Sequence, residues 1–344
     1  MSIYTTTQSQ LPSLYSAYAE IGVSLMVWGS PGIGKSQSVA AYAASIGGQM
    51  LDVRLSSYDS VDIRGLPDTS SGYTVWCPAS TLPIVGNDAF PDDIPLVLFL
   101  DELMLAKKEV FPVALQIILD RTVGEHKLKD NVQIIAASNR ETDRTGVAKM
   151  PTALANRFGH VEVVSDLEAW KKWAFNAGIH PAIVGYLNAR PQNLDQFEAA
   201  ALNGAKAFAT PRMWEFVNRA LSHGGTKDPA LTEVVLYTLL GEGVGAEFVG
   251  FLRTADRLPT LEQIVRDPEG AKVPQETDAL YACASMLSSR ITAKQVDAVV
   301  RYIQRLPLEY QSMWLADVSA TRPEFFVATP RLVLLAQELE KAMR

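Results

Sequence analysis

The stretch from Val23 to Ser45, VSLMVWGSPGIGKSQSVAAYAAS, decides the fold of the first half of the chain. It begins with an apolar run, Val23–Trp28, and continues through a glycine-rich segment, Gly29–Ser36. It ends in a helical pattern, Lys35–Ser45, which the pair Gly47-Gly48 stops. The middle segment fits the pattern GxxxxGK[ST], whose glycines let backbone amides wrap around phosphate oxygens. Strand, loop and helix together predict a phosphate-binding loop for a nucleotide.

Each residue type in this loop has a chemical reason to be there. Lys35 places a cation on the β- and γ-phosphates, and Ser36 offers a hydroxyl to Mg²⁺. A chance match in a glycine-containing loop is the alternative, and the flanking strand and helix argue against it. We therefore expect ATP and Mg²⁺ as ligands. The residues expected to bind the nucleotide are Gly29, Ser30, Pro31, Gly32, Ile33, Gly34, Lys35 and Ser36.

Two acidic residues follow a strongly apolar run. Leu96–Leu100 is almost continuously apolar, which is typical of a strand covered on both faces, and Asp101 and Glu102 come directly after it. We expect Asp101 to join Ser36 in holding Mg²⁺ and Glu102 to polarise a water for attack on the γ-phosphate. Acids also commonly end strands where they meet solvent. The position downstream of the phosphate loop favours the functional interpretation, and a carboxylate at Glu102 favours hydrolysis over transfer.

The first half alternates apolar runs with helical patterns, as α/β domains do. This predicts a P-loop NTPase fold, a three-layer αβα sandwich with a five-stranded parallel sheet. The expected strands are Val23–Trp28, Met50–Leu55, Leu96–Leu100, Val132–Ala137 and His160–Val164. The proline-rich connection Ser56–Pro95 is long enough to carry function or small elements of its own, and Tyr73–Trp76 is expected to be one arm of a hairpin.

After Val164 the pattern becomes mostly helical. Ser165 and Glu168 are expected to form a capping box at the first helix start, which places a domain boundary near residue 165. A softer boundary lies in the polar stretch Arg266–Thr277. We therefore expect a nucleotide-binding domain over 1–165, an α-helical lid over 166–262 and a helical C-terminal extension over 263–344.

Composition narrows the class of protein. The 344 residues include 31 Lys and Arg against 38 Asp and Glu, for a formal net charge of −7, so a strongly basic nucleic-acid domain is not expected. Cys77 and Cys283 are too few and too far apart for a disulfide framework. The histidine spacing does not suggest zinc. No Lys or Arg precedes Lys35 and no apolar run approaches the length of a membrane span, so we expect a soluble cytoplasmic protein.

The order of these motifs resembles the AAA+ ATPases, and among them the MoxR-type group that includes the CbbQ and NorQ activators. The resemblance covers roughly residues 20 to 220. Four further segments carry it. Asp62–Leu66 resembles the insertion in helix two, and Arg121–Glu125 resembles the hairpin before the fourth strand. Ile134–Asn139 resembles the sensor-1 strand, and Ala153–Phe158 resembles the arginine-finger segment.

The resemblance implies roles for two residues near the nucleotide. Asn139 matches sensor 1, where an amide bonds the attacking water or the γ-phosphate, although an Asn after a strand is also a common turn residue. Arg157 matches the arginine finger, which reaches the γ-phosphate bound by a neighbouring subunit and stabilises charge in the transition state. A surface arginine is the plainer interpretation, and Arg140 and Arg144 are nearby competitors for the role.

A third arginine lies in the helical region. Arg212 follows Thr210-Pro211, a sequence that marks a helix start. The resemblance implies that Arg212 is sensor 2, which links the lid to the nucleotide. A solvated helix arginine is the alternative.

The family further implies a ring, usually of six subunits, that uses ATP hydrolysis to remodel partner proteins as a chaperone-like activator. A von Willebrand factor A-type protein is an expected partner, nucleic acid is not, and no membrane insertion is expected. The hairpin Gly124–Lys127 could face a central pore and touch the client. A nucleic-acid motor or clamp-loader-like ATPase, and a scaffold that binds ATP without useful hydrolysis, remain as alternatives.

Overall fold

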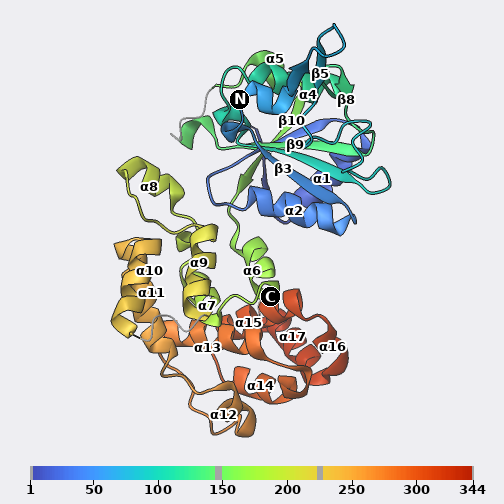
Figure 1. The fold of residues 1–344 in the computed structure, drawn as a ribbon. Coiled ribbons are helices and arrows are strands. Elements are labelled where there is room, and N and C mark those ends of the chain that lie inside the picture. The colour runs from blue at the N-terminus through green and yellow to red at the C-terminus, as the bar shows by residue number, and fades with distance from the viewer. Residues whose placement is uncertain (1–2, 144–148, 223–227, 343–344) are drawn as a thin grey trace. The chain divides into compact units, whose positions relative to one another are not determined.

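The computed structural model describes residues 3–143, 149–222 and 228–342 (Figure 1). The chain divides into two compact units, residues 1–165 and residues 166–344. Each unit has its own hydrophobic cores, and each is described by itself below.

The first unit is built on a six-stranded parallel sheet with the strand order β1-β10-β2-β9-β6-β3. The strands are β1 (Tyr4–Thr7), β2 (Ser24–Trp28), β3 (Gln49–Arg54), β6 (Leu96–Asp101), β9 (Val132–Ser138) and β10 (Phe158–Val164). The prediction of five strands was wrong by one, because β1 was missed. This strand is a short edge strand that pairs only with β10, and its threonines lack the apolar run that marks the central strands.

Helices cover both faces of the sheet. On one face, α1 (Leu11–Glu20) and α2 (Lys35–Ser45) pack on side chains of β2, β6, β9 and β10. On the other face, α3 (Ser60–Arg64), α4 (Phe111–Asp120) and α5 (Thr152–Ala155) share a larger core with the alternate residues of the same strands. This alternation is the two-residue period of a strand buried on both sides. The predicted three-layer sandwich is confirmed.

The long connection after β3 carries small elements. It contains the 3-10 turn η1 (Leu55–Ser57), helix α3, and an antiparallel hairpin of β4 (Leu66–Asp68) and β5 (Val75–Cys77). A second hairpin, β7 (Thr122–Val123) and β8 (His126–Lys127), follows α4. The two hairpins meet where His126 Nε2 and the Trp76 carbonyl oxygen lie 2.9 Å apart. Two further 3-10 turns, η2 (Leu103–Leu105) and η3 (Glu141–Asp143), follow β6 and β9.

The described part of the second unit is helical. Its helices are α6 (Leu167–Asn176), α7 (Pro181–Ala189), α8 (Phe197–Asn203), α9 (Pro211–Ser222), α10 (Pro229–Leu240), α11 (Glu242–Ala255), α12 (Leu261–Arg266), α13 (Thr277–Arg290), α14 (Val296–Ile303), α15 (Leu308–Thr321), α16 (Glu324–Ala328) and α17 (Pro330–Ala342), with 3-10 turns η4 (Pro191–Asn193) and η5 (Ala293–Gln295). None of the described helices is long and apolar enough to cross a membrane.

The first of these helices is capped differently from the prediction. The N-cap of α6 is Asp166, whose carboxylate accepts a hydrogen bond of 2.7 Å from the amide of Ala169. The expected capping box of Ser165 and Glu168 was therefore wrong by one residue, since aspartate is as good an N-cap as serine. Glu168 instead accepts a hydrogen bond from Lys171 Nζ.

The second unit holds two hydrophobic cores. One lies mainly among α6, α7 and α9 to α11, and the other among α12 to α17. Helices α7 and α13 join them, because a Cβ on Gly185 of α7 would stand 3.2 Å from the Cα of Ala282 on α13. The division into a lid over 166–262 and an extension over 263–344 stays a prediction.

Candidate nucleotide-binding site

The glycine-rich loop connects β2 to α2 and leaves little room for side chains. Gly32 and Gly34 have φ angles of +80° and +100°, in the region that favours glycine, and Gly34 is the N-cap residue of α2. A Cβ added to Gly29 would stand 3.0 Å from the carbonyl oxygen of Val163 on β10. The backbone path of the loop therefore depends on glycine, as a loop that presents amides to an anion requires.

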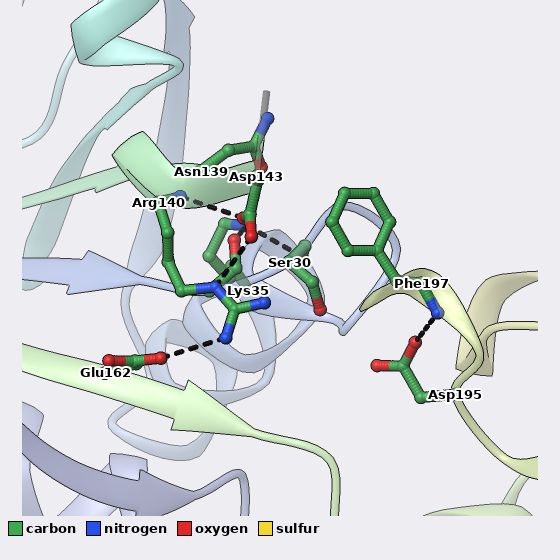
Figure 2. Close-up of polar contacts among 9 residues, drawn as sticks. Ser30, Lys35, Asn139, Arg140, Asp143, Glu162, Asp195 and Phe197 are labelled. Carbon is green, nitrogen blue, oxygen red and sulfur yellow. Dashed lines mark hydrogen bonds and ion pairs between the residues drawn. The ribbon is translucent and has the colours of Figure 1, made fainter. Parts of the chain in front are cut away.

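Lys35 lies across the loop that precedes it. Its Nζ donates to the carbonyl oxygens of Gly29 and Ser30, at 2.7 and 3.1 Å, and to Oδ1 of Asn139, at 3.2 Å (Figure 2). All three of these acceptors are neutral oxygens, and the bonds hold the ammonium beside the loop. A triphosphate supplies the anionic oxygens that such a cation attracts.

The predicted magnesium ligands lie together. Ser36 Oγ donates to Oδ2 of Asp101 at 3.1 Å, and the amide of Glu102 donates to Oδ1 of the same carboxylate at 2.9 Å. Burial raises the pKa of Asp101, and the two hydrogen bonds and the charge of Lys35 oppose that shift. A hydroxyl beside a carboxylate is a donor set that suits Mg²⁺, which prefers oxygen ligands. The residues present therefore fit the metal.

Glu102 takes an uncommon backbone conformation. Its φ is 55°, in the left-handed region, and its carboxylate accepts a hydrogen bond from Ser56 Oγ. Ser56 lies in η1, directly after β3, and β3 is the neighbour of β6 in the sheet. Sequence reasoning missed Ser56. The signal was its place at the carboxyl end of the strand beside β6, where polar residues from neighbouring parallel strands meet.

Asn139 follows β9 and accepts from Lys35, so the structure brings the residue predicted to be sensor 1 to the glycine-rich loop. The next residue, Arg140, is engaged elsewhere. Its Nε donates to Asp143 at 2.8 Å and a terminal nitrogen donates to Glu162 of β10 at 3.1 Å (Figure 2). Arg140 is thus held within its own unit, which weakens it as a competitor for the arginine-finger role. Arg144 lies outside the described residues.

Arg157 lies two residues beyond α5 and is exposed. Its guanidinium makes no hydrogen bond or ion pair with any described residue. It lines an open depression of about 540 Å³ together with residues of α5, Asn156 and His160. Within one chain the structure does not join Arg157 to the phosphate loop.

Arg212 lies in the second unit. Thr210 Oγ1 accepts from the amide of Met213 at 3.3 Å and Pro211 is the first residue of α9, so the predicted helix start is confirmed. Arg212 is exposed in the first turn of this helix. Its role as sensor 2 stays a prediction.

Among the described residues, no group of three or more His, Cys, Asp and Glu side chains could hold a metal ion. Cys77 is exposed and Cys283 is buried, and both are free thiols.

Comparison with known proteins identifies the segment that carries the site. Residues 24–158 match the family model of the AAA domain, dynein-related subfamily. That range includes the phosphate loop, the acidic pair, Asn139 and Arg157. No curated protein sequence matches the chain.

Solved structures resemble the chain only distantly. A mutant of RuvB from Thermotoga maritima is 13% identical over 94% of this chain and 89% of its own, with a TM-score of 0.39. A putative ATPase from Cytophaga hutchinsonii is 15% identical over 71% and 89%, with a TM-score of 0.36. NtrX from Brucella abortus, in complex with ADP, is 18% identical over 97% and 67%, with a TM-score of 0.39.

Proposed function

We propose that this chain, whose residues 24–158 match the AAA-domain family model, is a Mg²⁺-dependent ATPase of the MoxR type that assembles into a ring and remodels a protein client. One observation carries the hydrolase assignment. Lys35 bonds both the loop carbonyls and Asn139, while Ser36 of the same loop bonds Asp101. Motifs more than sixty residues apart in sequence therefore meet at one phosphate-binding loop.

The chemistry follows from the positions of these side chains. The loop amides and Lys35 bind the phosphates of ATP, and Ser36 and Asp101 hold Mg²⁺, which when bound neutralises charge on the phosphate oxygens. Glu102 accepts the proton of the attacking water. Asn139, held against Lys35, orients that water or the γ-phosphate.

Assembly completes the site in this proposal. The guanidinium of Arg157 is exposed and makes no hydrogen bond or ion pair with a described residue, which suits a group that acts on the ATP held by a neighbouring copy. Arg212 of the lid then reports the nucleotide state by domain closure. We infer a ring of six, a protein client and, in keeping with the MoxR type, a von Willebrand factor A-type partner.

The test of hydrolysis compares three variants. We expect Glu102→Gln to bind ATP and to lose turnover by about a hundredfold or more, because general-base contributions reach that size. Lys35→Ala should lose ATP binding itself. Glu109→Gln, an exposed carboxylate on the segment after β6, is the matched control and should behave like the parent protein.

Two results would contradict the proposal. One is turnover by Glu102→Gln at the parent rate, which would leave a nucleotide-gated scaffold. The other is turnover that rises with added DNA and falls steeply with salt, which would favour a nucleic-acid motor.

A further inference from the structure

A single histidine joins the strand before the phosphate loop to the helix before Arg157. His160, on β10, accepts a hydrogen bond at Nδ1 from Trp28 Nε1, at 3.1 Å. Its Nε2 lies 2.8 Å from the carbonyl oxygen of Ala155. Because an indole N–H can only donate and a carbonyl can only accept, Nδ1 carries no proton and Nε2 carries one. Both contacts together fix the ring as the neutral Nε2–H tautomer.

The two hydrogen-bond partners of the His160 imidazole each lie close to a residue of the proposed site. Trp28 is the last residue of β2, and the next residue, Gly29, accepts from Lys35 Nζ. Ala155 is the last residue of α5, two residues before Arg157. His160 therefore bonds one side chain next to the phosphate loop and one carbonyl next to the arginine that the proposed function assigns to the neighbouring site.

Packing ties the same three segments together. The Trp28 and His160 rings lie nearly parallel, with centroids 6.1 Å apart and an interplanar angle of 19°. Trp28, Leu154 of α5 and Phe158 of β10 lie in one hydrophobic core. Helix α5 has four residues, too few to hold a helical turn without tertiary contacts. Its position, and with it the start of the arginine side chain, is therefore set by these neighbours.

We propose that His160 is a positioning residue that holds Arg157 in place for the ATP site of the next copy and couples it to the phosphate loop of its own copy. This rests on the proposed function, in which Arg157 acts between copies. Trp28 is the link to the loop because it directly precedes Gly29, and the Ala155 carbonyl is the link to α5. Catalysis is sensitive to small misplacements of such a group, so the histidine acts on turnover and not on ATP binding.

Three substitutions separate the contributions of the two His160 hydrogen bonds, the one to Trp28 and the one to Ala155. His160→Asn keeps an acceptor close to the Nδ1 position, His160→Gln keeps a donor close to the Nε2 position, and His160→Phe keeps only the ring. We expect His160→Phe to lower kcat by about tenfold, the equivalent of one hydrogen bond to a positioned group, with the KM for ATP unchanged. His160→Gln should recover more turnover than His160→Asn, because the hydrogen bond to the Ala155 carbonyl supports α5.

A mixing experiment tests whether His160 acts on the ATP site of the neighbouring copy or on that of its own copy. Arg157→Ala subunits keep the ATP site but lack the arginine finger. Glu102→Gln subunits keep the arginine finger but lack the carboxylate that activates water. Mixed rings should regain turnover. Adding His160→Phe to the Glu102→Gln subunit should lower the regained turnover by about tenfold, whereas adding it to the Arg157→Ala subunit should change it little.

The outcomes are distinguishable. If the two starting variants do not complement, the proposed action between copies is wrong and the role of His160 falls with it. If they complement but His160→Phe lowers turnover equally in either subunit, or raises the KM for ATP, the histidine is structural and the inference is overturned. Should His160→Phe fail to fold, the Gln and Asn variants decide, since equal turnover by both would also contradict the proposal.

Discussion

Replacing Lys171 by methionine should strongly destabilise the second unit. Lys171 of α6 and Asp317 of α15 form an ion pair with Nζ and Oδ1 2.6 Å apart. Their side chains are 5% and 0% exposed. Asn188 of α7 also donates to Asp317, at 3.5 Å. The pair joins the first helix of the second unit to its C-terminal helices.

The size of the effect follows from burial. Burial by itself lowers the pKa of Lys171, but the charges of Asp317 and Glu168 prevail and raise it, so the side chain is an ammonium. Burial raises the pKa of Asp317 against the attraction of Lys171. Removing the ammonium leaves a carboxylate in the core, which costs about 3–5 kcal/mol. For a unit of this size that is a fall in Tm of about 6–20 °C.

The assay is thermal unfolding of the full chain, with the Lys171→Met/Asp317→Leu double variant as control. The double variant should recover most of the loss, because neutral side chains of similar volume carry no unpaired charge. The loss in Lys171→Met should be smaller at about pH 5 than at pH 8, since its unpaired Asp317 has a raised pKa and takes up a proton on acidification. A single variant within about 1 kcal/mol of the parent, or a double variant no better than the single, would refute this reasoning.

Three further predictions concern the site and the thiols. Gly34→Ala should weaken ATP binding by about tenfold or more, since φ at +100° strains a side chain, whereas Gly243→Ala, in open space on α11, should leave a fluorescent-nucleotide titration unchanged. Ser56→Ala should lower kcat by about tenfold with ATP affinity unchanged, because Glu102 loses a hydrogen bond to its carboxylate; an unchanged kcat in a steady-state assay would count against Ser56. Burial raises the pKa of Cys283 to about 11, so a thiol reagent near pH 8 should modify Cys77 alone in the folded chain and both thiols after denaturation.

Local sequence patterns were enough to predict the central fold. The phosphate loop lies between β2 and α2 as expected, and the predicted bounds of α2, Lys35–Ser45, agree with the structure. These elements carry strong signals, because a buried parallel strand is a continuous apolar run and a glycine-rich loop has few other uses. The acidic pair was found for the same reason, since Asp101 and Glu102 directly follow such a run.

Features that depend on contacts across the fold were not predicted. Strand β1 is short and rich in threonine, and its place is fixed by pairing with β10, more than 150 residues later. Ser56 and His160 are single polar residues whose partners come from other strands. No periodicity marks such residues, since their role follows from the order of strands in the sheet. The cap of α6 fell one residue from its expected place, because Ser165 and Asp166 are both good N-caps.

Strand β10 explains how the parts of the site keep their relative positions. By the two-residue period of a strand, His160 and Glu162 point to one face and Val161 and Val163 to the other. On the first face the two polar side chains bond Trp28, Ala155 and Arg140. On the second face the two valines pack in the core with α1 and α2. Substitutions of His160 and Glu162 should therefore change turnover more than stability, and substitutions of Val161 and Val163 should do the reverse.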